Sequence, residues 1–347
     1  MITPFSEPVR GGITTFVRNL SKELTKQGAH VLILSRQGTA DAGVQVLHGD
    51  AITFAHQASL AARKFEPHAI HAHGHWYAVR AALDARGPDS KVVFSFHTRW
   101  ATRGILRKRF LQRLVARCDH LTFPSQHLRD STHLALPSDK VKVVYPGSEL
   151  LSIDEEARNR LQAEFLLRKC TRSIGYVGQF HWREKARGFG FLLEALAEPS
   201  LGEVGLAVAG EGSFLDGMKK YADKLGVSRR VLFLGEVANP GFVYAGCDVY
   251  CHASLQEGMG LSVLEAMRLR CAIVGFRTPF MKEAITHDAE GLLADQSVDS
   301  LADMLSRVLS DSVLAKRLGE RAEWKAQRFF NWIQVARNFL DLYGVDS

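Results

Sequence analysis

The segment EGMGLSVLE carries two carboxylates eight positions apart, Glu257 and Glu265. The loop Gly258-Met259-Gly260 follows the first, and a helix predicted to begin near Leu261 holds the second. The unpaired N–H groups and partial positive charge of a helix N-terminus can bind a diphosphate. Glu265 could then accept hydrogen bonds from vicinal hydroxyls such as those of a ribose, while Glu257 reaches the group beyond the phosphates. Two glutamates at this spacing also occur by chance on solvent-exposed helices, so both interpretations stay open here.

The helix that holds Glu265 needs a sheet to pack on. Leu261, Leu264 and Met267 lie on one helical face, and the strand-like stretch CAIVGF follows them, which is typical of a helix packed on a parallel sheet. The second half of the chain repeats this alternation. Strands are predicted at residues 172–178, 206–211, 231–235 and 248–252, and a helix is predicted to include residues 191–196.

The first half shows the same order of elements. A short strand at residues 1–5 precedes Gly11 and Gly12, which would let a ligand approach the backbone in front of a helix. Further strands are predicted at residues 30–34, 69–73, 92–97, 121–124 and 141–145. Such alternation predicts a doubly wound parallel sheet, whose ligands bind beyond the carboxyl ends of the strands. His97 lies at such an end.

Length and composition indicate two globular domains. The chain has 347 residues, of which 46% are hydrophobic and 23% charged, more than one hydrophobic core usually organises. We expect an N-terminal domain over residues 1–150 and a C-terminal domain over residues 151–330. One helix is predicted from about residue 324 to residue 343, and its apolar surface predicts that residues 331–347 pack back on the first domain.

Charge and cysteine content restrict the class of protein. The five cysteines are odd in number and show no paired spacing, so a reducing cytosol is expected rather than a disulfide framework. No apolar run is long enough to span a bilayer, and no secretory leader is recognised. We therefore expect a cytoplasmic protein, either soluble or peripheral at the inner face of the membrane. The net charge of +7 favours anionic partners.

A strongly basic stretch predicts a surface helix with an anionic partner. Its charged residues are Arg99, Arg103, Arg107, Lys108, Arg109, Arg113 and Arg117. Leu106, Phe110, Leu111, Leu114, Val115 and Cys118 recur at helical spacing and are expected to pack on the domain. An anionic membrane or a phosphate-bearing acceptor would suit the basic face, and a solvated face is the alternative. Nucleic acid is not expected, because the aromatic residues lack the layout of a stacking platform.

Four histidines, His68, His71, His73 and His75, raise the question of a metal site, since the last three would share one face of an extended strand. No carboxylate or cysteine completes a ligand set, so we expect no metal. Histidines that lie near a binding site at the end of a strand are the simpler interpretation.

Short motifs recur along nearly the whole chain, namely Pro8 to Gly12, His71-Ala72-His73, Phe96-His97-Thr98, Ser125, Tyr145-Pro146-Gly147, Gly178, Gly210-Glu211-Gly212, Ala253-Ser254, and Glu257 with Glu265-Ala266-Met267. With these motifs the chain resembles the family 4 glycosyltransferases. The pair of glutamates is the most specific of these. The resemblance implies the GT-B fold, in which two Rossmann-like domains, for acceptor and nucleotide sugar, face each other across a cleft.

The resemblance also implies roles for single residues. Glu257 would lie near the transferred hexose, His97 would contact the donor sugar beside the reacting carbon, and Glu265 would hold the ribose. The backbone of Gly12, with Gly11, would approach the diphosphate, and Glu211 and the residues from Gly258 to Leu261 would complete the donor site. Transfer would retain the anomeric configuration without a cofactor or metal.

Two departures from the family pattern affect these expectations. Gln179 replaces an arginine usual on the diphosphate, which leaves Arg183, Lys185 and Arg187, on a longer basic loop, as candidates for that role. Pro279 and Phe280 replace two glycines, so close backbone approach to the donor is not expected there.

The expected function is transfer of a hexose from a nucleotide-diphosphate sugar, with UDP or GDP, to a lipid, glycan or small molecule. A nucleotide-sugar-binding protein impaired in catalysis is the alternative, and another enzyme of the same fold, such as an epimerase, is a third possibility.

Overall fold

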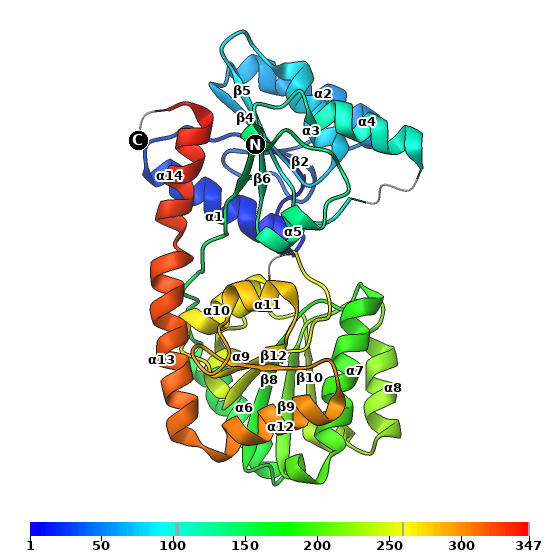
Figure 1. Ribbon diagram of the computed structural model, residues 1–347, viewed down its shortest axis with the longest axis vertical. Helices are drawn as coiled ribbons and strands as arrows, with labels where there is room; N and C mark the ends of the chain where they lie inside the picture. The colour runs from blue at the N-terminus through cyan, green and yellow to red at the C-terminus, as the bar shows by residue number, and fades with distance from the viewer. Residues whose placement is uncertain (101–103, 259, 346–347) are drawn as a thin grey trace. The chain divides into compact units, whose positions relative to one another are not determined.

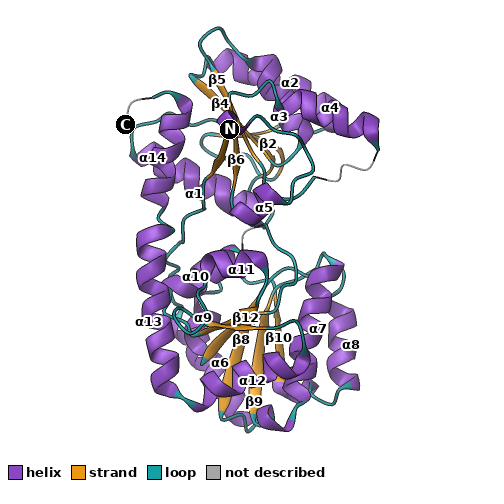
Figure 2. Cartoon of the chain, in the orientation of Figure 1, coloured by secondary structure: helices purple, strands orange, loops and turns teal. Residues whose placement is uncertain are grey.

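The computed structural model describes residues 1–100, 104–258 and 260–345. The chain forms two compact units. Unit 1 comprises Met1–Gly147 together with Asn331–Ser347, and unit 2 comprises Ser148–Phe330. Figure 1 shows that each unit contains a sheet with helices on its faces, and Figure 2 shows the strands.

Unit 1 is built on a seven-stranded sheet in the order β3-β2-β1-β4-β5-β6-β7, and its paired strands are all parallel. The strands are β1 (Ile2–Phe5), β2 (Ile33–Gln37), β3 (Val44–Val46), β4 (Ala69–His73), β5 (Lys91–Ser95), β6 (His120–Phe123) and β7 (Val141–Val143). The helices are α1 (Gly12–Lys26), α2 (Ala51–Phe65), α3 (Trp76–Ala85), α4 (Ile105–Val115), α5 (Gln126–Asp130), the 3-10 helix η1 (Ser138–Lys140) and α14 (Trp332–Tyr343).

Helix α14 completes the core of unit 1 although it comes from the end of the chain. Its apolar residues Phe339 and Trp332 are buried against Phe16 of α1, with ring centroids 6.0 Å and 5.4 Å from the Phe16 ring. Asn331 begins the helix, because its side chain accepts a hydrogen bond from Ile333 N at 2.8 Å. The sheet therefore has one face closed by a segment far away in sequence.

Unit 2 is built on a six-stranded parallel sheet in the order β10-β9-β8-β11-β12-β13. The strands are β8 (Arg172–Val177), β9 (Val204–Ala209), β10 (Val231–Gly235), β11 (Val249–His252), β12 (Ile273–Phe276) and β13 (Leu292–Ala294). The helices are α6 (Glu155–Leu167), α7 (Arg183–Ala197), η2 (Pro199–Leu201), α8 (Leu215–Lys224), η3 (Ser228–Arg230), α9 (Gly241–Gly246), α10 (Leu261–Arg268), α11 (Pro279–Ala284), α12 (Val298–Ser310) and α13 (Ser312–Phe329).

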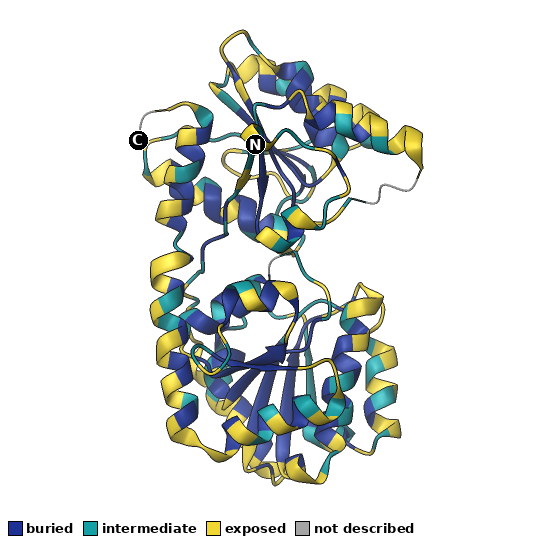
Figure 3. Ribbon diagram, viewed as in Figure 1, coloured by how far each residue is buried: buried dark blue, intermediate teal, exposed yellow. Residues whose placement is uncertain are grey.

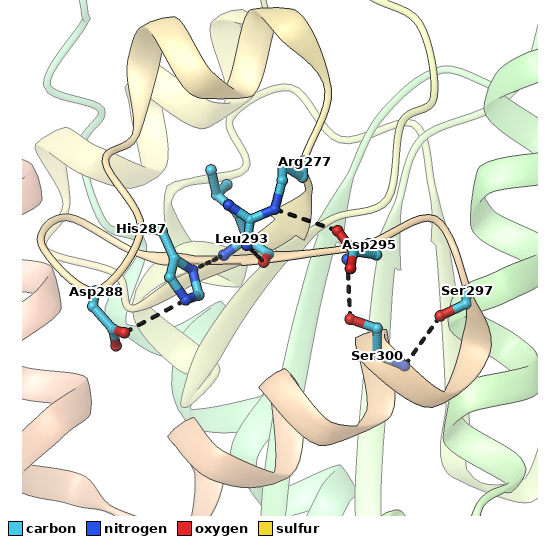
Figure 4. Close-up of polar contacts among 7 residues, drawn as sticks. All are labelled: Arg277, His287, Asp288, Leu293, Asp295, Ser297 and Ser300. Atoms are coloured by element: carbon cyan, nitrogen blue, oxygen red, sulfur yellow. Dashed lines mark hydrogen bonds and ion pairs between the residues drawn. The ribbon is translucent and has the colours of Figure 1, made fainter.

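The strands of unit 2 are almost continuously apolar because helices cover the sheet on both sides. Strands β9, β11, β12 and β13 are buried throughout and β10 is mostly half-buried, while the helices alternate between buried and exposed residues, as Figure 3 shows. Polar contacts tie the last two strands to the loops that follow them, as Figure 4 shows. Arg277 donates to Leu293 O at 2.9 Å and to Asp295 at 3.3 Å, and His287 Nδ1 accepts from Leu293 N at 2.9 Å.

Several expected elements differ from the structure. Strands β5, β7 and β9 each end two residues earlier than expected. Strand β2 begins at Ile33 rather than at residue 30. The single helix expected from residue 324 to residue 343 is wrong, because α13 ends at Phe329 and Asn331 caps a new helix. The longer basic loop is also wrong: Arg183, Lys185 and Arg187 lie at the start of α7.

Candidate functional site

The topology of unit 2 selects one place for a ligand. Strands β8 and β11 are neighbours, but the chain continues from β8 to β9 on one side and from β11 to β12 on the other. Open α/β sheets bind ligands at such a switch point, outside the carboxyl ends of the strands. The loops that leave these two strands contain Gln179 and Glu257, so the predicted donor residues of unit 2 lie around its switch point.

Glu257 is a buried carboxylate with two charged or chargeable neighbours. Its Oε1 lies 3.0 Å from Lys185 Nζ and 3.8 Å from His252 Nε2, and only 15% of its side chain is exposed. Burial alone would raise the pKa of Glu257, but Lys185 and His252 outweigh it and the pKa lies below its ordinary value. The carboxylate is therefore ionised at neutral pH. The structure thus brings together Lys185 and Glu257, two residues predicted separately.

Glu265 accepts a hydrogen bond from a tyrosine. The hydroxyl of Tyr244 donates to Glu265 Oε2 at 2.9 Å, and Tyr244 is itself buried. Glu265 lies one turn into α10, whose N-cap is Gly260, while Met259 lies outside the described residues. Leu261 begins the helix and Gly258 precedes it in the loop. A partly exposed carboxylate behind a helix N-terminus can bind hydroxyls beside an anion.

The remaining predicted donor residues of unit 2 differ in their exposure. Arg183 and Arg187 are exposed on α7, and Glu211 is exposed after β9. Gln179 is half-buried, and its Oε1 has no hydrogen-bond partner among the described residues. Gly210 has a φ of 147°, and a Cβ there would lie 1.9 Å from Gly178 O, so only glycine allows these two loops to meet.

The segment that replaces the two family glycines forms a helix. Thr278 caps α11 by accepting from Met281 N at 3.3 Å, and Pro279 occupies the first helical position. Phe280 is buried with its ring centroid 6.2 Å from that of His252, and Glu283 is half-exposed. Phe280 therefore fills space beside Gly260, one of the predicted donor residues, instead of leaving backbone open to a ligand.

Unit 1 has its own switch point, between β1 and β4. The loop after β1 holds Gly11, which precedes α1 with a φ of 154°, a conformation that favours glycine, and Gly12, which is the first residue of the helix. Both glycines are exposed, and a Cβ at either would meet nothing within 4 Å. Their backbone is open to a ligand.

His97 ends a row of three histidines in unit 1. Its Nε2 lies 3.2 Å from His73 Nδ1, and the ring centroids of His73 and His71 are 3.9 Å apart with the ring planes tilted by 34°. His71 is hydrogen-bonded to Ser95 Oγ at 2.6 Å and to the Tyr343 hydroxyl of α14 at 2.7 Å. Burial lowers the pKa of His97 to about 3 and those of His71 and His73 well below 6.5. All three rings are neutral at physiological pH, and within the described residues no three side chains are placed to hold a metal ion.

The basic helix is shorter and more apolar at its surface than expected. Helix α4 begins only at Ile105, Arg99 lies in the loop before it, and Arg103 lies outside the described residues. Leu111, Leu114, Val115 and Cys118 are buried as expected. Leu106 and Phe110 are not buried: the exposed fraction is 83% for Leu106 and 48% for Phe110. None of the helices in the described ranges is apolar over a length that could cross a bilayer.

Three residues in contact with these sites were missed by the sequence analysis, namely His252, Tyr244 and Tyr343. His252 ends a predicted strand five positions before Glu257, so a polar residue at a strand end was the available signal. Tyr244 and Tyr343 reach Glu265 and His71 from other elements, and nothing in the sequence pairs them.

Two family profiles match the chain, one over each half. The profile described as "Glycosyltransferase Family 4" matches residues 10–150, and the profile described as "Glycosyl transferases group 1" matches residues 158–324. Together they cover most of both units.

Similar curated proteins include the D-inositol 3-phosphate glycosyltransferase of Corynebacterium urealyticum, 29% identical over 219 residues, 59% of this chain and 51% of that protein. Another is the alpha-monoglucosyldiacylglycerol synthase of Streptococcus pneumoniae, 22% identical over 90% of this chain and 82% of that protein. In the first three curated relatives, the chain spans between 51% and 60% of their length.

Solved structures resemble the chain from end to end. HepE of Anabaena in complex with UDP-glucose superposes with a TM-score of 0.83 at 19% identity, covering 99% of this chain and 98% of that chain. A sucrose-phosphate synthase from Thermosynechococcus elongatus gives a TM-score of 0.81 at 19% identity, with 99% and 98% covered.

Proposed function

The chain belongs to the family 4 glycosyltransferases, and we propose that it transfers a hexose from a nucleotide-diphosphate sugar to an acceptor. Its fold is GT-B, with two Rossmann-like α/β domains. The observation that carries the proposal is the grouping at the switch point of unit 2. There Lys185 and Glu257 form an ion pair, and Glu265 lies eight positions beyond Glu257 on α10.

Each part of a nucleotide sugar has a chemical counterpart in this grouping. Glu265 accepts hydrogen bonds from the ribose, and the N-termini of α10 and α7 with Lys185, Arg183 and Arg187 offer positive charge to the diphosphate. This charge stabilises the leaving group without a metal ion. Glu257 orients the hexose.

Residues of unit 1 are also proposed to bind a nucleotide sugar. His97, which is neutral and hydrogen-bonded to His73, contacts a hexose, and the backbone of Gly11 and Gly12 approaches a diphosphate. Transfer proceeds with retention, the leaving phosphate taking the acceptor proton. The donor nucleotide is UDP, a choice supported by the likeness to HepE in complex with UDP-glucose, and the acceptor is a lipid, glycan or small molecule.

A binding protein without transfer activity is the second candidate, and Gln179 favours it. An amide cannot replace the cationic fork of an arginine on a diphosphate. The buried Oε1 of Gln179 would also need a donor from the ligand.

The experiment that separates the two candidates measures both binding and release. UDP-, GDP- and ADP-sugars are offered with a cell extract that supplies acceptor, and nucleotide diphosphate is detected by mass spectrometry. Release from one donor supports the transferase. Tight binding of one donor without release under any acceptor condition contradicts it and supports the binding protein.

Helix α4 is proposed to hold the protein on an anionic membrane. It exposes Ile105, Leu106 and Phe110 beside Arg107 and Arg109, the pattern of a helix lying in the interface. A basic residue near an anionic surface contributes about 1 kcal/mol, so replacing Arg107 and Arg109 by Glu should weaken binding to phosphatidylglycerol vesicles more than tenfold.

The control for this prediction is an exposed leucine elsewhere. Leu166 of α6 is 72% exposed, and Leu166→Glu should leave vesicle sedimentation unchanged, whereas Leu106→Glu should reduce it. If the wild type and the α4 variants sedimented equally with vesicles, the basic face of α4 would be solvent-exposed without a membrane partner.

A further inference from the structure

One ring nitrogen of His252 is hydrogen-bonded, and the other faces Glu257, the carboxylate that is predicted to orient the hexose. The residue ends β11 and is 3% exposed. Its Nδ1 lies 3.1 Å from the Tyr250 hydroxyl, which donates to Ser262 Oγ at 2.9 Å. A phenol has one proton, so the hydroxyl that donates to Ser262 accepts from Nδ1. The ring proton of a neutral His252 therefore lies on Nδ1, and Nε2 carries a lone pair.

The free nitrogen and the carboxylate are close but not hydrogen-bonded. Nε2 lies 3.8 Å from Glu257 Oε1, and it has no hydrogen-bond partner among the described residues. Two atoms that both carry lone pairs have no proton to share, which accounts for this distance. Lys185 Nζ, 3.0 Å from the same oxygen, supplies the only close full positive charge that the described contacts give Glu257.

Donor binding, as proposed above, disturbs this balance. A diphosphate brings two negative charges and attracts the Lys185 ammonium, which is 21% exposed and ends a flexible chain. Glu257 would then be a buried carboxylate without its counter-ion, which is strongly unfavourable. We propose that His252 Nε2 takes up a proton from solvent when the donor binds and replaces Lys185 as the partner of Glu257 Oε1. His252 is thus a positioning residue that keeps Glu257 ionised and oriented toward the hexose.

The electrostatics of the free protein agree with this exchange. Burial lowers the pKa of His252 to about 4, Glu257 acts to raise it and Lys185 acts to lower it. The titratable groups that face the imidazole are Glu257, Lys185 and Tyr250. Movement of Lys185 toward the diphosphate removes a positive charge that lowers the pKa of His252. The negative charge of Glu257, which raises this pKa, stays in place. The neutral ring of the free protein becomes an imidazolium in the complex.

The test is proton uptake measured by calorimetry. UDP-glucose is titrated into the protein at pH 6 in two buffers with different ionisation enthalpies, and its diester phosphates do not titrate there. We expect the wild type to take up about half to one proton more per bound UDP-glucose than His252→Gln, whose amide cannot be protonated. Lys185→Met should also reduce uptake, because His252 beside an unpaired Glu257 is already protonated in the free variant.

A second histidine beside a carboxylate provides the control. His287 Nε2 lies 3.4 Å from Asp288, and His287→Gln should keep the uptake of the wild type. Binding of UDP-glucose with equal proton uptake in wild type and His252→Gln would overturn the role of His252 alone. If the wild type binds no sugar nucleotide of the UDP, GDP and ADP series, the proposed function fails, and this inference, which rests on it, fails too.

Discussion

Replacing Glu257 by Gln is expected to lower kcat/KM for hexose transfer by about 10²- to 10³-fold, the loss typical of removing one preorganised electrostatic contact. The substitution keeps the size of the side chain but removes its charge. Lys185 Nζ, which lies 3.0 Å from Glu257 Oε1, then has no carboxylate partner. It can still bind the diphosphate, but no carboxylate remains near the hexose. Steady-state rates of nucleotide diphosphate release, measured over a range of donor concentrations, separate the effect on kcat from that on KM.

A matched ion pair in the same unit controls for loss of charge alone. Glu290 and Lys325 lie 3.3 Å apart with side chains 15% and 17% exposed, close to the 15% and 21% of Glu257 and Lys185. Glu290→Gln should change stability in a similar way and leave kcat/KM within about twofold of the wild type, since neither Glu290 nor Lys325 is among the residues proposed to contact the donor. If Glu257→Gln and Glu290→Gln had equal activities, Glu257 would have no role in transfer.

The strands were predictable where the pattern of apolar residues also marks the ends of the strand. Val231–Gly235 is a strand with the expected bounds, because a short apolar run there is enclosed by polar or turn residues. Ala69–His73 also has the expected bounds, and its histidines alternate with apolar residues. Apolar periodicity alone misled at the end of the chain. It runs across Phe330 and Asn331, so it does not reveal the cap that divides α13 from α14.

The candidate site was predictable only as far as single motifs carry it. Glu257 and Glu265 share one segment, and their spacing is visible in the sequence. The contact of Lys185 with Glu257 depends on the adjacency of β8 and β11, which only the sheet order supplies. For the same reason Tyr343 could not be assigned to His71, since 272 residues separate them in the chain.

Replacing Phe339 by Ala is expected to destabilise unit 1 by about 3 to 5 kcal/mol, the usual cost of truncating a buried aromatic residue. Phe339 is fully buried, and its ring centroid lies 6.0 Å from Phe16 and 4.8 Å from His71. Its removal opens a cavity between α1 and α14 and loosens the row of histidines that ends at His97. Native-state hydrogen exchange of the α14 amides reports the opening free energy of this unit.

An exposed apolar residue on the same helix separates burial from helix content. Ile333 is 46% exposed, so Ile333→Ala should change the opening free energy of α14 by less than about 1 kcal/mol. Should the two variants exchange at the same rate, the docking of α14 would not be a principal source of stability for unit 1. A selective effect of Phe339→Ala, with activity reduced as well, would show that the end of the chain supports the histidine that is predicted to contact the donor sugar.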